Sequence, residues 1–167
     1  WDVTREDQDR FAVQSYARAN KAVAQGRFKD EIMPVSIPQR KGDPKIFDTD
    51  ECPQETSFEF LSKMKPAFKK DGVGTAGNAS IIADGASAVV VMSESKAKAL
   101  GCTVMAEIGA QASYGIDMKY VLMAPIYAIP KVLKKQGIGI NDVDLFEINE
   151  AFSGTSTGIN KVLELDP

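Results

Sequence analysis

The first clear pattern of hydrophobic positions lies near the start of the chain. Residues at helical spacing recur there, and they are Ala12, Tyr16, Ala19 and Val23. Thr4 stands before this run with Asp7 three residues later, which is the arrangement of a capping box with a short acid. Gly26 follows the run and is typical of a helix C-terminus. We therefore predict a helix between Thr4 and Gly26.

Shorter patterns of the same kind predict two more helices. Thr56 and Glu59 form a second capping-box pattern, and the apolar positions after it continue on one side until Pro66. Ser93 is a suitable N-cap for a helix that reaches Gly101.

The last third of the chain predicts a further pair of helices. Ile126, Ile129 and Leu133 mark the first, which ends at Gly137; Pro130 either kinks it or lies in its first turn. Residues 151–165 form the second, whose inward positions are Thr155, Ile159 and Val162.

Four stretches have the composition or alternation of strands. Residues 31–37 alternate, but Pro34 restricts that strand to an edge or a bulge. Residues 87–93 are rich in β-branched side chains, residues 103–114 begin in the same way, and residues 143–148 form the fourth. Strands that alternate with helices predict an α/β fold with layers, in which a mixed, largely parallel sheet is covered by helices.

Composition excludes several classes of protein. The 167 residues are 44% hydrophobic and carry a net charge of -3 with no strong run of either sign, so nucleic acid is not an expected partner. The longest apolar runs are far shorter than the roughly 20 residues of a membrane span, so no membrane association is expected. The first residues lack the features of a signal peptide, which favours a cytoplasmic location.

The inventory of reactive side chains is sparse. The chain has no histidine, and its two cysteines, Cys52 and Cys102, have no metal-ligand spacing. No metal site is therefore predicted. Two acidic neighbours precede Cys52, and Cys102 follows a predicted helix C-terminus; both surroundings oppose thiolate formation, so we expect both cysteines to be structural.

Residues 71–80, DGVGTAGNAS, contain the spacing GxGxxG. A dinucleotide-binding loop would need a hydrophobic strand directly before it, yet KPAFKKD precedes Gly72. Glu94 does lie where a ribose-binding acid would be expected, but little room remains for a crossover helix. The simpler alternative is that these glycines allow a sharp turn with positive φ.

Five stretches of the chain, in this order, together resemble the thiolase family, acetyl-coenzyme A acetyltransferases above all. They are TREDQDRFAVQS near the start, GRFKDEIMPV at 26–35, KPAF at 65–68, residues 74–101 and FEINEAF at 146–152. The resemblance implies a partial thiolase-like layered fold with part of a loop domain. It implies that residues 1–81 end the loop domain, residues 82–102 close the N-terminal domain, and residues 103–167 form the first half of the C-terminal domain.

The resemblance also implies acyl transfer between acyl-CoA thioesters by Claisen condensation or thiolysis, in fatty acid metabolism. Asn149 matches the family's asparagine, which holds a water of an oxyanion hole, and a neutral amide is suited to donate there. Taken alone, Asn149 also suits the N-cap of the helix that follows.

By the same resemblance, residues of the glycine-rich stretch and of FEINEAF line the pantetheine tunnel. The implied substrate-binding residues are Phe68, Ala76, Ser80, Ile82, Ala151 and Phe152. Plain core packing is the alternative for each apolar one of them taken alone.

The family's nucleophilic cysteine, second cysteine and Gly-His-Pro histidine have no counterpart in these residues, so we expect a central fragment of a longer acyltransferase. Such an enzyme uses acyl-CoA and coenzyme A as substrates, needs no separate cofactor, and is usually a homodimer or homotetramer. A noncatalytic module that binds coenzyme A or acyl groups is the alternative.

Overall fold

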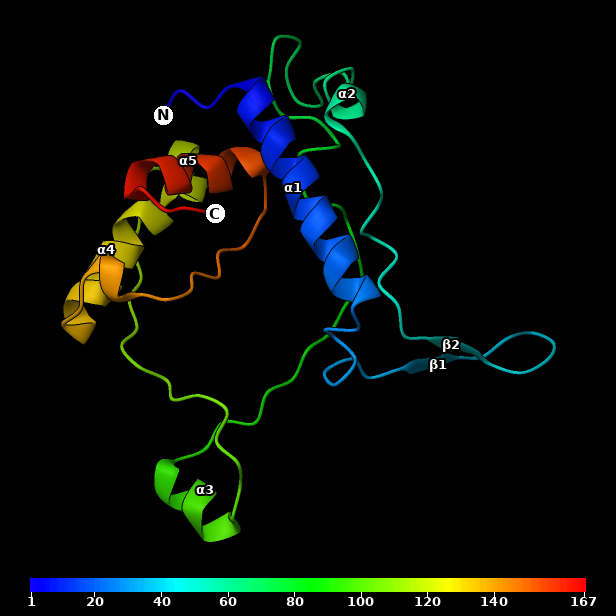
Figure 1. Ribbon diagram of the computed structural model, residues 1–167, viewed down its shortest axis with the longest axis vertical. Coiled ribbons are helices and arrows are strands. Elements are labelled where there is room, and N and C mark those ends of the chain that lie inside the picture. Colours follow the sequence, from blue (N-terminus) through cyan, green and yellow to red (C-terminus); the bar gives the residue numbers. More distant parts are fainter.

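The structure is a computed structural model that describes residues 1–167, and Figure 1 shows its arrangement. Along the chain the elements are α1 (Arg5–Ala24), β1 (Val35–Ile37), β2 (Lys45–Phe47), α2 (Phe58–Leu61), α3 (Glu94–Leu100), the 3-10 helix η1 (Met118–Met123), α4 (Pro125–Gln136), the 3-10 helix η2 (Ile140–Asp142) and α5 (Ser153–Leu163). Helices α1, α4 and α5 form one group, whereas the β1–β2 hairpin and α3 project from it on long connections.

Helix α1 begins as its sequence predicts. The Thr4 hydroxyl accepts a hydrogen bond from the backbone N–H of Asp7 at 3.1 Å, and the Asp7 carboxylate accepts one from the Thr4 N–H at 2.9 Å. The Asp7 carboxylate also accepts from the Thr4 hydroxyl at 2.7 Å, and the hydrogen bonds that it receives from the Thr4 N–H and hydroxyl lower the pKa of Asp7, since they favour its charged form. The reciprocal cap satisfies two N–H groups that the first turn would leave without partners.

Two other predicted helices have the predicted ends. Ser93 caps α3, whose C-cap Gly101 is left-handed at φ 63°. Gly137 ends α4 in the same conformation, with φ 77°. Pro130 lies inside α4, and the proline in its first turn is Pro125.

The second predicted helix differs from its pattern. Helix α2 starts at Phe58 because the Ser57 hydroxyl, and not that of Thr56, accepts the capping hydrogen bond, from the N–H of Phe60 at 3.2 Å. The helix also ends at Leu61, well before Pro66. After α2 the Leu61 carbonyl accepts a turn hydrogen bond from the Met64 N–H at 3.0 Å and a tertiary one from Arg5 of α1 at 2.6 Å.

Helix α5 supplies the centre of the hydrophobic core. Ile159 is completely buried and packs with Met123 of η1 and Ile126 of α4. Thr155 is buried as predicted, but the prediction of an inward Val162 is wrong, since this side chain is 42% exposed. Leu163 packs against the core in its place.

The predicted sheet is not assembled from these residues. The only sheet is the antiparallel hairpin in which β1 pairs with β2, and Pro34 lies just outside β1. The expected strands at 87–93, 103–114 and 143–148 run without any ladder partner. A strand requires a hydrogen-bonded neighbour for its N–H and C=O groups, and none of these stretches has one.

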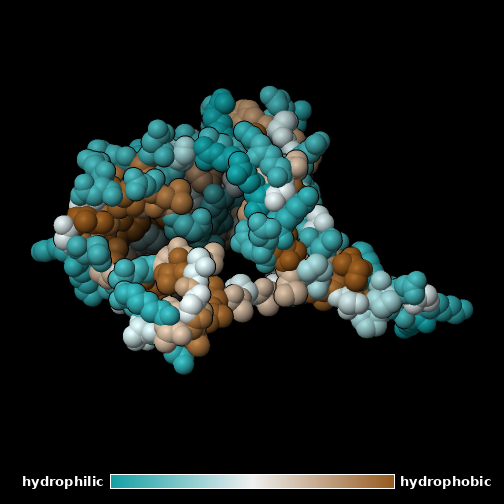
Figure 2. Space-filling view, turned by 60° about the horizontal axis from the view of Figure 1, so that its bottom comes forward, coloured by the Kyte–Doolittle hydropathy of each residue, from teal (hydrophilic) through white to brown (hydrophobic).

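Much apolar surface stays open as a result. The chain exposes 13431 Å², whereas a compact protein of its mass would expose about 8,000 Å². Val89, Val90 and Val91 are 86%, 86% and 67% exposed. Figure 2 shows hydrophobic side chains open on one face of the molecule, around its hollow. None of the helices combines the length and the apolar character required to cross a bilayer.

Candidate active site

Two stretches that the sequence predicts to share a site lie directly against one another. We call residues 71–80 the glycine turn and residues 149–153 the Asn149 segment. The N–H of Ser80 donates to the carbonyl of Ala151 at 3.0 Å, and the N–H of Ser153 donates to the carbonyl of Asn78 at 2.9 Å. Ala79 and Phe152 form an antiparallel bridge between these two bonds. The backbone alone therefore fixes the glycine turn to the start of α5.

An aromatic pair strengthens this junction. The rings of Phe68 and Phe152 meet edge to face, with centroids 5.9 Å apart and planes at 76°. This geometry places the positive edge of one ring toward the negative face of the other. Phe68 begins the loop that closes where the N–H of Ala67 donates to the carbonyl of Gly74 at 2.9 Å. The KPAF stretch, the glycine turn and the Asn149 segment are therefore one unit.

Gly77 of the turn is needed for space. None of Gly72, Gly74 and Gly77 has positive φ, so the positive-φ explanation is wrong. A Cβ on Gly77 would lie 2.5 Å from Cδ2 of Leu61 and 2.7 Å from Sδ of Met64. Side chains of the α2 region thus pack directly on the turn backbone.

The dinucleotide interpretation has no support in the backbone. The glycine turn follows a loop and precedes an extended stretch, so neither a strand before it nor a helix after it is present. Both are needed to present helix N–H groups to a pyrophosphate.

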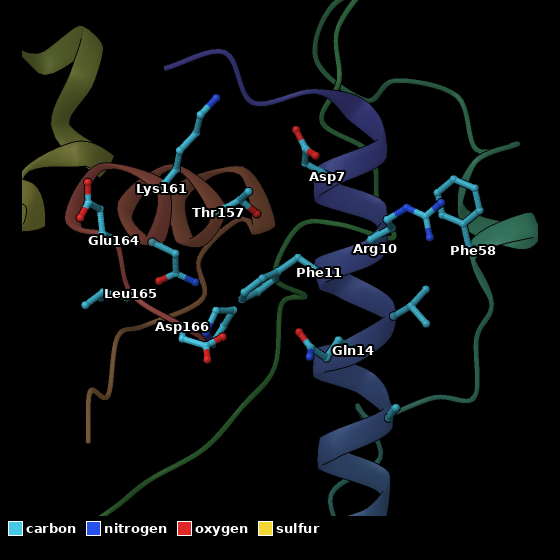
Figure 3. A pocket seen from close by; sticks show the side chains of 14 residues that line it. Asp7, Arg10, Phe11, Gln14, Phe58, Thr157, Lys161, Glu164, Leu165 and Asp166 are labelled. Carbon is cyan, nitrogen blue, oxygen red and sulfur yellow. The ribbon is translucent and has the colours of Figure 1, made fainter. Parts of the chain in front are cut away.

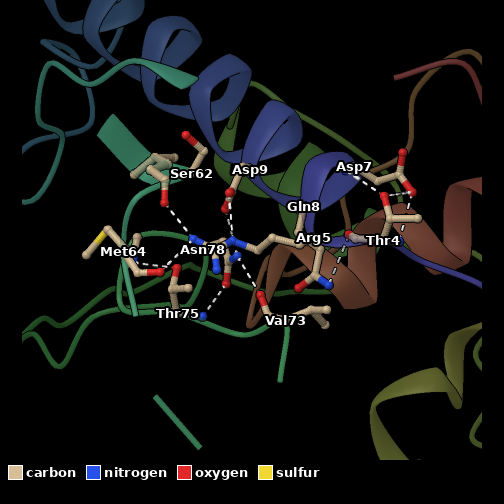
Figure 4. A network of polar contacts seen from close by, with 12 residues as sticks. Thr4, Arg5, Asp7, Gln8, Asp9, Ser62, Met64, Val73, Thr75 and Asn78 are labelled. Atoms are coloured by element: carbon tan, nitrogen blue, oxygen red, sulfur yellow. Dashed lines mark hydrogen bonds and ion pairs between the residues drawn. The ribbon is translucent and has the colours of Figure 1, made fainter. Parts of the chain in front are cut away.

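A network of polar groups joins the glycine turn to α1, as Figure 4 shows. The Asn78 side chain accepts from the N–H of Thr75 at 2.8 Å and donates to Asp9 Oδ1 at 2.9 Å and to the Val73 carbonyl at 3.1 Å. Asp9 is 0% exposed, and Arg5 Nε lies 2.7 Å from its other oxygen. Arg5 also donates to the carbonyls of Leu61 and Met64 at 2.6 and 3.0 Å.

The predicted catalytic amide is free in this chain. Asn149 is exposed and its side chain makes no hydrogen bond. Helix α5 has Phe152 at its N-cap with no side-chain cap, so the capping alternative for Asn149 is wrong. The amide is thus available to a group from outside the chain.

The other predicted site residues divide into two groups. Ser80, Ala151, Phe152 and Phe68 meet at the junction described above. Ala76 and Ile82 make none of these contacts: both are exposed, Ile82 completely. The assignment of all six residues of these two groups to a pantetheine tunnel stays a prediction.

A small cleft of about 190 Å³ lies beneath the junction, between it and α1. It is lined by Ala12, Ser15, Tyr16, Ala19, Cys52, Pro53, Gly77, Asn78, Ala79, Ser80, Ile81, Glu150 and Ser153.

A hydrogen bond to Asp50, followed by burial and the charges of Asp50 and Glu51, raises the pKa of Cys52. This thiol is therefore a poor nucleophile, as the acidic neighbours predict.

A larger cleft of about 1000 Å³ lies elsewhere, between α1 and α5, and Figure 3 shows the side chains around it. Asp7, Arg10 and Lys161 give it charges of both signs. None of the predicted site residues lines it. Its size therefore does not make it the candidate site.

The link between the glycine turn and the Arg5–Asp9 pair is not predicted from the sequence. Asn78 lies inside the glycine-rich motif, and the Arg5–Asp9 spacing of four residues is typical of a helical ion pair. That spacing indicates the ion pair, but only the fold shows that Asn78 lies against Asp9.

Comparison with known families accounts for both halves of the chain. Residues 1–95 match the family model described as thiolase, N-terminal domain, and residues 102–167 match the one described as thiolase, C-terminal domain. The chain belongs to the thiolase family. The predicted family is thereby confirmed, and the resemblance of the five stretches is explained by common descent.

Curated relatives agree with this assignment. The chain is 48% identical over 167 residues to an acetyl-CoA acetyltransferase of Pseudomonas aeruginosa and 52% identical over 164 residues to one of Thiocystis violacea. These matches cover 99% and 98% of the chain and 42% of each relative. The thiolase chain thus spans less than half the length of these relatives.

Solved thiolase structures confirm the predicted fold class. The acetyl-CoA acetyltransferase of Bacillus anthracis matches with a TM-score of 0.95 at 42% identity, over 99% of this chain and 42% of that one. The human mitochondrial 3-ketoacyl-CoA thiolase matches with a TM-score of 0.91 at 38% identity, over 98% and 41%. The extended, unpaired stretches therefore follow the course of the chain in complete thiolases.

Proposed function

We propose that this thiolase chain is part of an acyltransferase of the acetyl-CoA acetyltransferase kind. The reaction is transfer of an acyl group between coenzyme A thioesters, either by joining two of them or by thiolytic cleavage of a 3-ketoacyl thioester. The observation that carries the proposal is the docking of the glycine turn on the Asn149 segment through the Ser80–Ala151 and Asn78–Ser153 hydrogen bonds.

The chemistry needs a donor at a thioester oxygen. Carbon–carbon bond formation passes through an enolate, whose negative charge gathers on that oxygen. A neutral amide can donate directly or through a water without itself changing charge. Asn149 is exposed, has no internal partner and begins the segment that the turn holds, so it fits this role.

We propose that the pantetheine arm of the substrate runs along the turn. Small residues there allow a slim amide chain to approach the backbone, and the Ser80 hydroxyl can donate to or accept from an amide. Phe68 and Phe152 form an apolar border beside this path.

Other groups of the reaction must come from outside these residues. The chain has no histidine, and the raised pKa of Cys52 argues against its use as a nucleophile. We propose that the complete protein has the length of its relatives and is a dimer or tetramer. The nucleophilic cysteine, the second cysteine and the histidine then come from the rest of that protein.

Thiolysis tests the proposal directly. The full-length protein containing this chain is mixed with a 3-ketoacyl-CoA and free coenzyme A, and loss of the 3-ketoacyl thioester is followed together with formation of two acyl-CoA products. Turnover supports acyl transfer. Tight binding of coenzyme A without turnover would establish a binding module in its place.

A further inference from the structure

The buried ion pair beneath the glycine turn has no part in the chemistry proposed above. Asp9 is completely buried, and the Arg5 side chain is only 23% exposed. Burying a carboxylate is costly unless it is paired and hydrogen-bonded. The two oxygens of Asp9 are both used, one by Arg5 Nε and the other by Asn78 Nδ2.

Asn78 links the Arg5–Asp9 pair to the glycine turn and so fixes the position of the turn. Its amide uses both ends, since Oδ1 accepts from the Thr75 N–H while Nδ2 donates to Asp9 and to the Val73 carbonyl. Only a side chain with a donor and an acceptor on one planar group makes this set of bonds. The side chain is therefore held in one orientation from two sides.

The backbone of the same residue reaches the proposed site. The Asn78 carbonyl accepts the N–H of Ser153, in the first turn of α5, and two residues later the Ser80 N–H donates to Ala151. A displacement of Asn78 would therefore move the glycine turn relative to Ala151 and to Asn149 before it. Arg5 also holds the Leu61 and Met64 carbonyls, whose side chains pack on Gly77.

We propose that Asn78, held by the buried Asp9–Arg5 pair, is a positioning residue of the acyl-transfer site. It sets the distance between the turn that receives the pantetheine arm and the segment that carries Asn149. The inference rests on the proposed function, and it assigns a role in that function to groups that touch no substrate.

The experiment exchanges donor and acceptor in the full-length protein. Asn78→Asp puts a carboxylate against Asp9 in place of the 2.9 Å hydrogen bond, so the turn must move away. We expect kcat/KM for coenzyme A in thiolysis to fall by at least about tenfold, with KM raised. Adding Asp9→Asn restores a donor opposite an acceptor, and the double variant should recover most of the loss.

A matched variant separates positioning from stability. Ile126→Val removes a methylene from the core of α4, away from the turn, and should lower the melting temperature without changing kcat or KM. All assays are run well below the melting temperature of every variant. If Asn78→Asp fails to fold, Asn78→Ser takes its place, because serine is too short to reach Asp9. The same fall in kcat/KM for coenzyme A is expected of this variant.

The outcomes distinguish the two proposals. An active wild type whose Asn78 variants keep normal kcat and KM, with only a lowered melting temperature, overturns the positioning role and leaves acyl transfer intact. Failure of Asp9→Asn to rescue Asn78→Asp likewise overturns the Asp9–Asn78 link. A wild type that shows no acyl transfer overturns the proposed function and this inference together.

Discussion

The aromatic rings of Phe68 and Phe152 meet edge to face at 5.9 Å, although one residue lies in the N-terminal family match and the other in the C-terminal one. One belongs to KPAF and the other to the stretch that carries Asn149. Their contact joins the part of the chain that matches the N-terminal thiolase model to the part that matches the C-terminal one. This junction is the basis of the predictions that concern activity.

Replacement of Asn149 by alanine should lower turnover more than substrate affinity. A lost oxyanion donor lowers kcat by about 10²–10³-fold in other enzymes. Because the Asn149 side chain makes no hydrogen bond within the chain, the melting temperature should stay unchanged. Steady-state kinetics of the full-length protein check this. Asn141→Ala, at another exposed asparagine, is the control; a rise in KM alone for Asn149→Ala would reassign it to binding.

Replacement of Gly77 by alanine should destabilise the protein through overpacking. The new Cβ would lie 2.5 Å from Leu61 Cδ2, so side chains or the turn must shift, at a cost of about 1–3 kcal/mol. Urea unfolding of the full-length protein measures the loss. Gly85→Ala is the matched control, since its Cβ would meet nothing within 4 Å. Equal stability of the two variants would contradict the packing of α2 on the turn.

The capping box of α1 should make stability depend on pH. Hydrogen bonds from the Thr4 N–H and hydroxyl lower the pKa of Asp7 in the folded protein. Its contribution is therefore present above the unfolded pKa, about 3.9, and is lost as pH falls through the lower folded value. Wild type should melt above Asp7→Asn at pH 6, and the two melting temperatures should converge once the pH falls below the folded pKa of Asp7.

Thermal unfolding at a series of pH values checks this expectation. Asp30→Asn is the control, because Asp30 is exposed and makes no hydrogen bond. A constant difference between wild type and Asp7→Asn at all pH values would show that charge at Asp7 has no role in the cap.

Cys52 should react slowly with alkylating reagents. Its raised pKa leaves little thiolate at pH 8, and Asp50 is the largest cause. Asp50→Asn should therefore speed alkylation of Cys52, while Cys102 in the same molecule serves as the internal reference. Peptide mass spectrometry after timed iodoacetamide treatment gives both rates. Unchanged alkylation of Cys52 would remove Asp50 as the cause.

The 167-residue chain by itself should be loosely packed or should aggregate. Only 14 residues are buried, and three consecutive valines are open to solvent. Binding of a hydrophobic dye, light scattering and a broad thermal transition are the expected observations. A monodisperse monomer with one sharp, cooperative melt is the result that would contradict this expectation.

Local signals predicted the helices well. Thr4, Ser93, Gly101 and Gly137 act on neighbours within one turn, so their effect is independent of distant parts of the chain. Ser57 replaced Thr56 as a cap because both hydroxyls have the correct chemistry and only the fold decides which one reaches the N–H of Phe60. The predicted strands cannot be stabilised by neighbours in sequence, since each needs a second strand as its hydrogen-bond partner.

The sequence by itself determined the family, the positions of α1, α3, α4 and α5, and the acidic neighbours that raise the pKa of Cys52. All of these depend on residues close together along the chain or on motifs kept in order. Only the tertiary structure decided that Gly77 is needed for space, that Asn149 caps nothing, and that Asp9 lies under Asn78. These facts depend on which distant segments meet, and no spacing along a chain specifies a contact across it.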